Sequence, residues 1–288
     1  MTLASIRSWP RLERPVLVIG LEGWVDAGFA TATSVNTLLE LTHHEVVATF
    51  DSDALLDQRS RRPLLRVTNG VLGPLTWPEL QLYSATDTGG RSLLMLAGPE
   101  PDMRWHEWTN EVVALGLRLE VGMVVGLGAF PAPVPHTRAV RLAATATDEE
   151  LAGKVGFLPA TLEIPGGAQA ALEMAFGEAG VPSVGVWARV PHYAAGTPYP
   201  EAAAALLDEL SRLTGVNIDT EALHQAGRKA RDQIQALIEA SEEHSAMVRQ
   251  LEQQHDAELG MSATEFSDLP TGDELAAELE KYLRGEGR

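Results

Sequence analysis

Short apolar runs rich in β-branched residues recur along the first two thirds of the chain and predict the strands of one sheet. They occupy residues 16–21, 46–50, 80–83, 93–96, 121–127, 140–143 and 184–190. Segments with a helical repeat of apolar positions lie between them, at 29–41, 103–117, 168–179 and 201–213. Because strands that alternate with helices of this length favour crossover connections, the pattern predicts an α/β protein. We expect a three-layer α/β/α sandwich with a mainly parallel central sheet.

The pattern changes after Gly215, where no further strand-like run occurs. Residues 219–254 contain no proline and carry an apolar stripe, which predicts one long helix or a helical hairpin. A capping box, Thr271-Gly-Asp-Glu274, then predicts a last short helix. The chain is therefore expected to comprise an α/β/α core at 1–215, a helical appendage at 216–260 and a tail with a short helix at 261–288.

The last predicted helix places four apolar side chains on one face, namely Leu275, Leu279, Tyr282 and Leu283. Between residues 256 and 288 there are nine carboxylates and three basic side chains, so this apolar face lies in a strongly acidic tail. The face packs either on its own domain or on a neighbouring subunit or partner. We therefore treat these four residues as a candidate interface.

Charge and composition exclude several classes of function. The 288 residues carry 22 Lys and Arg against 40 Asp and Glu, a formal net charge of −18, which repels phosphate backbones and anionic lipids. No cysteine is present, which rules out disulfides, thiolate nucleophiles and cysteine-bound zinc. No run approaches the roughly 20 apolar residues of a membrane span, and no secretory signal is evident. We expect a cytoplasmic protein without nucleic-acid or membrane partners, metal or cofactor.

The loop after the first strand is the first candidate site. It carries Gly20, Gly23 and Gly28 together with two carboxylates, Glu22 and Asp26. The glycine spacing is neither that of a dinucleotide fingerprint nor that of a P-loop, and the carboxylates oppose a phosphate. Glu22, Gly23 and Asp26 are candidate ligand contacts. In the alternative interpretation, the glycines serve backbone turns and Asp26 caps the following helix.

A second candidate site follows the predicted strand at 121–127. There a proline-rich loop carries His136 and Arg138, two residues apart. Ligands of open α/β sheets bind beyond the carboxyl ends of the strands, where this loop belongs. His136 is a candidate general base and Arg138 a candidate anion clamp, with Glu22 as the third catalytic candidate. Stiffening of the loop by proline is the alternative explanation of this segment.

Further polar residues complete the rim of the predicted cleft as candidate ligand contacts, namely Asp53, Arg59, Glu100 and His192. The mixed-charge segment 57–63 is also explained by internal ion pairs or by an interface. No Gly-x-Ser-x-Gly elbow is present, and His106-Glu107 lacks the second histidine of a zincin helix because Asn110 occupies that position. No recognised catalytic constellation emerges.

Several segments carry a family resemblance through their order and spacing. They are the glycine loop after the first strand, residues 53–63, residues 96–102 followed by Trp105 and Trp108, Pro135-His-Thr-Arg138, and residues 186–193. Together they resemble the proteasome-assembly-chaperone family in its actinobacterial-type branch. The resemblance runs from about residue 16 to residue 213 and continues more weakly into the helices. It implies an α/β/α sandwich related to nucleoside phosphorylases, an appended helical region and homo-oligomers, a trimer among them.

The same resemblance implies a role in assembly, because eukaryotic relatives help to build proteasome α-rings. One device of those relatives is a C-terminal hydrophobic–Tyr–any tripeptide. This sequence ends Glu286-Gly-Arg288, and Lys281-Tyr282-Leu283 has lysine where the hydrophobic residue belongs, so we do not expect insertion of the tail into a ring pocket. The family supplies no established catalytic residues.

Three hypotheses follow. The first is a non-enzymatic protein-interaction or assembly-chaperone-like protein whose exact client the sequence does not identify, with a proteasome-related protein as the candidate. The alternative is a small-molecule-binding protein, or a hydrolase- or phosphorylase-like enzyme, that uses the cleft at the carboxyl ends of the strands. The third is a self-assembling oligomer whose helical region forms the subunit interface.

Overall fold

The computed structural model describes residues 2–157, 161 and 163–264. The chain divides into two compact units, residues 1–236 and residues 237–288, which we describe separately. None of the described helices is long and apolar enough to cross a membrane.

The first unit is built on a sheet of eight strands within the described part of the chain. In spatial order the strands are β1 (Ala4–Ile6), β3 (His43–Phe50), β6 (Gln81–Thr86), β7 (Ser92–Pro99), β2 (Val16–Glu22), β8 (Met123–Ala132), β10 (Ser183–Pro191) and β9 (Leu142–Ala146). All seven strands predicted from the sequence occur. The unpredicted β1 has only three residues, too few to show a period.

The centre of the sheet is parallel, as predicted, and its outer strands are antiparallel. Strands β7, β2, β8 and β10 run in one direction, with Val18 of β2 paired to Met95 on one side and Val125 on the other. Strands β6 and β9 run against their inner neighbours, and β3 runs against β6. Hence β2, β3, β7, β8 and β10 all end at the same edge of the sheet, here called the carboxyl edge.

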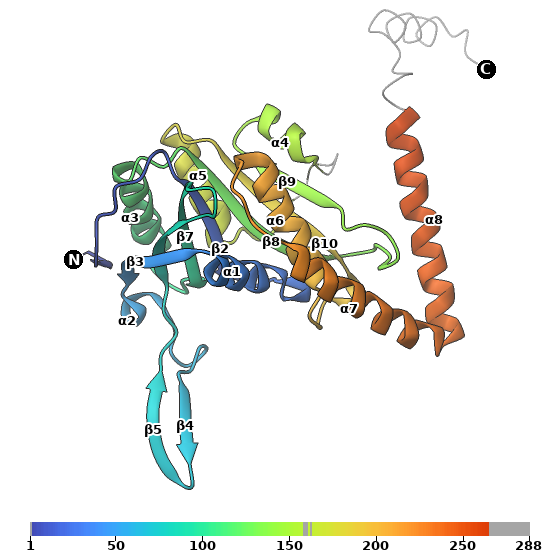
Figure 1. Ribbon diagram of the computed structural model, residues 1–288, viewed down its shortest axis with the longest axis horizontal. Helices are drawn as coiled ribbons and strands as arrows, with labels where there is room; N and C mark the ends of the chain where they lie inside the picture. The colour runs from blue at the N-terminus through green and yellow to red at the C-terminus, as the bar shows by residue number, and fades with distance from the viewer. Residues whose placement is uncertain (1, 158–160, 162, 265–288) are drawn as a thin grey trace, which may run out of the picture. The chain divides into compact units, whose positions relative to one another are not determined.

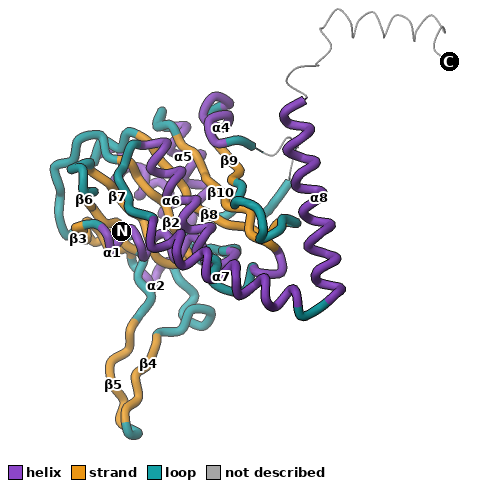
Figure 2. Tube along the Cα trace, turned by 45° about the vertical axis from the view of Figure 1, so that its right-hand side comes forward, coloured by secondary structure: helices purple, strands orange, loops and turns teal. Residues whose placement is uncertain are grey.

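Helices cover both faces of this sheet (Figure 1, Figure 2). Helices α1 (Ala30–Leu41) and α6 (Pro200–Thr214) pack together on one face, and α3 (Trp105–Arg118) and α5 (Ala168–Glu178) pack on the other. Short helices α2 (Ser52–Leu55) and α4 (Glu149–Val155) and 3-10 turns η1 (Ala27–Phe29) and η2 (His192–Ala194) lie in the connections. The predicted α/β/α sandwich is confirmed.

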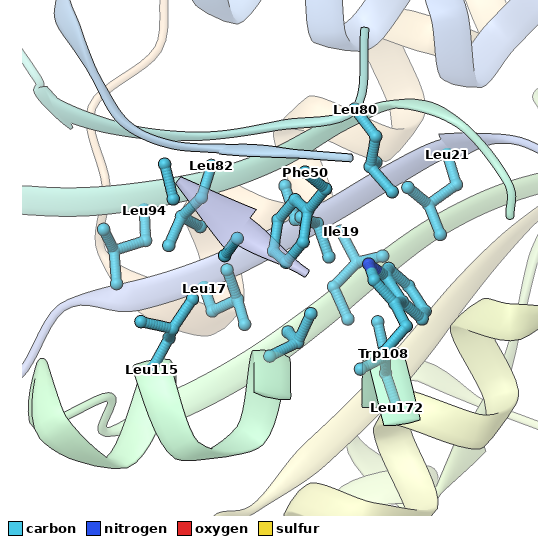
Figure 3. Packing of buried hydrophobic residues seen from close by; sticks show 14 of the residues in the cluster. Leu17, Ile19, Leu21, Phe50, Leu80, Leu82, Leu94, Trp108, Leu115 and Leu172 are labelled. Carbon is cyan, nitrogen blue, oxygen red and sulfur yellow. The ribbon is translucent and has the colours of Figure 1, made fainter. Parts of the chain in front are cut away.

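Alternation along β2 shows why two apolar cores form. Leu17, Ile19 and Leu21 point to the face covered by α3 and α5, while Val18 points to the face covered by α1 and α6. Figure 3 shows the first core, in which Trp108 of α3 is fully buried, with its ring centroid 6.3 Å from that of Phe50. A strand buried on both faces needs an unbroken apolar run, which is the signal that predicted β2.

Two strands stand apart from the main sheet. Strands β4 (Leu64–Thr68) and β5 (Val71–Thr76) form a separate antiparallel hairpin that projects from the carboxyl edge (Figure 1). Every residue of both strands is exposed. The sequence did not predict this hairpin, because no buried face imposes a period of two on it.

The predicted helical segment 219–254 consists of two helices, α7 (Glu221–Glu239) and α8 (Glu242–Thr264). They are separated by Ala240 and Ser241, and the Ser241 hydroxyl accepts a hydrogen bond from the His244 amide (3.4 Å), a helix-start contact. The predicted short helix with Leu275, Leu279, Tyr282 and Leu283 lies outside the described residues.

Candidate functional site

The carboxyl edge collects most of the polar residues that the sequence nominated. Glu22 ends β2 and is exposed, Glu100 follows β7 and is buried, and His192 follows β10 and is exposed. Asp53 lies in the exposed first turn of α2, just beyond β3. The structure thus gathers these groups at one edge of the sheet, and the contacts of each group show what it does there.

Asp26 caps helix α1. Its two carboxylate oxygens accept hydrogen bonds from the amides of Thr31 (2.8 Å) and Ala32 (3.1 Å) in the first turn of that helix. These amides have no partner within the helix, and the helix dipole favours a negative charge beside them. Asp26 therefore caps the helix that follows it, as the alternative interpretation of this loop expects.

Glu100 plays the same part for helix α5. Its Oε1 accepts a hydrogen bond from the amide of Ala168, the first residue of α5, while its own amide donates to the Glu22 carbonyl (3.2 Å). Gly167 leaves room for this carboxylate, because a Cβ there would lie only 3.0 Å from Glu100 Oε1. Gly23 lies beside it, with its Cβ position at an ordinary contact distance of 3.5 Å from Glu100 Oε2. The structure therefore brings Glu22, Gly23 and Glu100 together, as a support for α5.

Arg61 joins the base of the hairpin to this group. Its Nη1 donates to the Glu22 carbonyl (3.4 Å), and its Nη2 lies 3.8 Å from Asp102 Oδ1. Asp102 also accepts from the Asp57 amide (2.7 Å), and Asp57 in turn accepts from the Arg59 amide (2.9 Å). The mixed-charge segment thus forms an internal network, one of the two roles expected for it, and the Arg59 side chain is exposed.

His136 is held in a second group at the ends of β8 and β10. Its ring is fully buried; Nδ1 lies 2.8 Å from the Tyr193 hydroxyl and Nε2 lies 2.9 Å from Gln235 Oε1 of α7. Because an amide oxygen can only accept, Nε2 carries a hydrogen, and the Tyr193 hydroxyl also accepts from the His136 amide (2.8 Å). Both ring nitrogens face protein groups, whereas a general base needs one of them to reach a substrate.

The neighbours of His136 also have partners. Arg138 is half-buried, and its Nη1 donates to the Thr137 hydroxyl (3.3 Å). The His192 ring packs edge-on against Tyr193, with centroids 5.3 Å apart. This group therefore ties the proline-rich loop, β10 and α7 to one another.

A buried carboxyl group that the sequence analysis missed lies on the opposite side of α5 from solvent. Glu173 Oε1 accepts from Gln169 Nε2 (2.9 Å), and its Oε2 accepts from the Thr145 hydroxyl (3.2 Å). Gly126 and Gly185, directly paired across β8 and β10, make the space: a Cβ at either would lie 2.3 Å or 2.6 Å from Glu173 Oε1. The sequence feature that could have indicated this buried carboxyl group is the presence of a glycine in each of two apolar strands, Gly126 and Gly185.

Burial raises the pKa of Glu173 to about 7, although the hydrogen bonds from Gln169 and Thr145 lower it. The carboxyl group therefore titrates near neutral pH. The Glu173 side chain is enclosed between α5 and the sheet, and the residue is only 5% exposed. We therefore expect its ionisation to affect the stability of the fold.

Two open depressions lie elsewhere on the described surface. One, of about 490 Å³, is lined by β1 and the end of β3, and the other, of about 540 Å³, lies between the end of α5 and the start of β10. Among the described residues, no group of three or more histidines and carboxylates is arranged to hold a metal ion. Neither depression contains a residue nominated from the sequence.

The comparison with known proteins places this chain. A model of the PAC2 family matches residues 20–238. The chain belongs to the PAC2 family. It is 35% identical to Rv2714, a Mycobacterium tuberculosis protein of unknown function, over 89% of this chain and 92% of the other, with a TM-score of 0.84. No curated protein matches it.

Two further solved structures match over most of the chain. One is Rv2125 of M. tuberculosis, described as a proteasome-assembly chaperone homologue, with 32% identity over 81% of this chain and 99% of the other and a TM-score of 0.75. The other is a PAC2 family protein of Streptomyces avermitilis, with 36% identity over 81% and 99% and a TM-score of 0.73. The predicted resemblance, including its actinobacterial branch, is confirmed.

Proposed function

We propose that this PAC2 protein is a non-enzymatic, assembly-chaperone-like protein whose client is a proteasome-related protein. The proposal draws on its 32% identity to a proteasome-assembly chaperone homologue over 81% of the chain. A protein of this type acts by binding other chains, so its functional groups belong on exposed surfaces rather than in a closed pocket.

One observation carries the proposal. The polar groups that an α/β enzyme would turn toward a substrate are bound here to the protein itself: Asp26 caps α1, Glu100 caps α5, and the buried His136 contacts Tyr193 and Gln235. The alternative, a small-molecule-binding protein or a hydrolase- or phosphorylase-like enzyme, would need these groups to converge on a cavity. That alternative is the less well supported of the two.

The exposed apolar surface agrees with a binding role. Trp24 is 64% exposed and Phe29 48% exposed at the carboxyl edge, and the β4–β5 hairpin adds further exposed apolar side chains. Clusters of large apolar side chains on a soluble protein mark contact surfaces. The apolar face predicted in the tail, with Leu275 and Leu279, is a further proposed interface.

Affinity purification of the full-length chain at its native expression level, with quantitative mass spectrometry, tests the proposal. We expect proteasome subunits among the enriched proteins, with weaker recovery for Leu275→Ser/Leu279→Ser. A matched variant, Ala277→Ser/Lys281→Ser, changes the predicted opposite face of the same helix and should leave recovery unchanged. Recovery of copies of this chain alone would contradict the proposal.

A further inference from the structure

The segment between β1 and β2, residues 7–15, is rich in arginine. It contains Arg7, Arg11 and Arg14 but only one carboxylate, that of Glu13, and all four side chains are exposed. The segment connects the end of β1 to the start of β2 at the edge of the sheet opposite the carboxyl edge (Figure 1). A chain with a formal net charge of −18 therefore presents a positive segment at this edge.

Both ends of this segment are bonded to the sheet. The amides of Arg7 (2.8 Å) and Ser8 (3.4 Å) both donate to the Val47 carbonyl in β3. At the other end, the Pro15 carbonyl accepts a hydrogen bond from the Gly122 amide (3.0 Å), just before β8 begins. The side chains between these two anchors therefore project from a backbone that is fixed at both ends.

Trp9 lies in the middle of the segment and stacks on an arginine of a different element. The Trp9 residue is 42% exposed, and the guanidinium carbon of Arg118 lies 3.5 Å from the centroid of its ring. Arg118 is the last residue of α3, where the helix dipole favours a positive charge. The contact is a cation–π interaction that holds both side chains at the surface. Tryptophan and arginine are also among the residue types most enriched at the energetic centres of protein interfaces.

The backbone of Arg14 is strained. Its φ is +43°, in the left-handed region that residues other than glycine rarely enter. Gly122 permits the close approach of this backbone, because a Cβ there would lie only 3.3 Å from the Arg14 carbonyl oxygen. Backbone strain of this kind concentrates at functional sites, since an exposed loop gains no stability from it. We call the exposed side chains of this region the basic surface, namely Arg7, Trp9, Arg11, Arg14 and Arg118.

The four guanidinium groups of the basic surface form no ion pair with a carboxylate in the part of the chain that the structure describes. Other surface arginines do form such pairs, for example Arg104 with Glu107. Even with Glu13 and Glu120, the adjacent carboxylates in the sequence, the four arginines give a net charge of +2. The remaining residues carry 18 basic side chains against 38 acidic ones, a net charge of −20. The basic surface is therefore a local reversal of the protein's field.

We propose that the basic surface binds an acidic segment of the client protein, with an apolar side chain of that segment packed against Trp9. The proposal rests on the proposed function, which supplies the existence of a protein client. Unpaired guanidinium groups bind carboxylates through charge-assisted and often bidentate hydrogen bonds, and opposite charges speed the encounter. A second copy of this chain is a poorer occupant, because a two-fold symmetric contact through this surface would place its arginines against one another.

Site-specific photo-crosslinking identifies the occupant. The full-length chain is expressed in its native host with p-benzoylphenylalanine in place of Arg11, or in place of the exposed Glu178 as the control position. After irradiation, mass spectrometry locates the crosslinked residues. We expect position 11, and not position 178, to crosslink to a segment of another protein with more Asp and Glu than Lys and Arg. A crosslink to a basic segment, or only to this chain, would overturn the proposal, and so would equal labelling at both positions.

Charge reversal tests whether the basic surface supplies affinity. Arg7→Glu/Arg11→Glu should lower recovery of the client about tenfold or more in quantitative affinity purification of the full-length chain. Lys229→Glu/Arg249→Glu makes the same change in charge at exposed positions of α7 and α8 and should leave recovery unchanged. All four changed side chains are exposed, so circular dichroism should show an intact fold.

The same purification separates this proposal from the proposed function. If the wild-type protein and Arg7→Glu/Arg11→Glu recover the same amount of client, the basic surface is not the binding site, while the assembly role stands. An equal loss in the Lys229→Glu/Arg249→Glu control would also overturn the proposal, because net charge alone would then explain binding. If the wild-type protein recovers no client, both proposals fail.

Discussion

The imidazole of His136 joins the proline-rich loop to helix α7 through Gln235, with Nε2 and Oε1 2.9 Å apart. The contact spans 99 residues of sequence, and the ring is fully buried. A histidine that looked like a general base in the sequence is in this way a link between loop and helix. The hydrogen bonds of His136 to Tyr193 and Gln235 therefore give it a structural role.

Replacing His136 tests this role. His136→Ala leaves the Tyr193 hydroxyl and the Gln235 amide without their shared partner, and we expect a loss of about 1–3 kcal/mol in the free energy of unfolding. Hydrogen exchange should become faster in Glu221–Glu239, measured by mass spectrometry. His192→Ala, at an exposed neighbour, should change stability by no more than about 0.5 kcal/mol. Equal effects of the two substitutions would contradict the role.

Asp26 and Glu22 distinguish a helix cap from a ligand contact. Asp26→Ala removes the acceptor of two amides in α1 and should lower the free energy of unfolding by about 1 kcal/mol. Glu22→Ala should be nearly neutral, because it is the Glu22 carbonyl that accepts the bonds described above. Denaturant titration measures both. A neutral Asp26→Ala together with a destabilising Glu22→Ala would contradict the assignment.

Glu173 predicts how stability varies with pH. Its pKa of about 7 in the folded protein exceeds the 4.5 of a solvated glutamate, so the folded state binds the proton more tightly. The contribution of Glu173 to the free energy of unfolding is therefore greatest below pH 4.5. It falls by about 3 kcal/mol in all as the pH rises from 4.5 through 7. The side chain of the Glu173→Gln variant stays neutral at every pH. The free energy of unfolding of this variant relative to that of the wild type should therefore rise as pH increases from 4.5 to 7. An advantage that does not change with pH would contradict burial of the carboxyl group.

Gly126 makes room for the same carboxyl group. A Cβ there would lie 2.3 Å from both Gln169 Nε2 and Glu173 Oε1, so Gly126→Ala should destabilise the protein by about 1–3 kcal/mol. Gly153 in α4 has no atom within 4 Å of its Cβ position, and Gly153→Ala should stabilise by about 0.5–1 kcal/mol. Thermal unfolding of the two variants provides the comparison. An unchanged or raised stability of Gly126→Ala would contradict the close packing of Glu173 against this glycine.

The elements that sequence predicted best are those whose burial imposes a period. Strands buried on both faces, such as β2, and helices with one buried face, such as α6, carry the pattern directly. The β4–β5 hairpin is exposed throughout, so its sequence was under no such constraint. The break between α7 and α8 at Ala240 and Ser241 depends on local capping. The sequence pattern was therefore compatible with either one long helix or two helices.

The sequence predicted where several polar side chains gather but not what each of them contacts. The chain order of strands puts Glu22, Glu100 and His192 at one edge, and a carboxylate before a helix indicates a cap, which was the alternative given for Asp26. Glu173 was missed because a glutamate on a helix normally faces solvent, and only the pairing of Gly126 with Gly185 reveals the space for it. Such pairing depends on strand order, which no single segment encodes.

The most direct test of the account is native mass spectrometry of the purified full-length protein mixed with purified proteasome α- and β-subunits of the same organism. The account predicts a complex between this chain and at least one subunit, and a change in the yield of assembled rings. If the protein binds no subunit and leaves ring assembly unchanged, yet binds a small molecule whose affinity falls on Glu22→Gln, the assembly role is contradicted and the carboxyl edge is a ligand site.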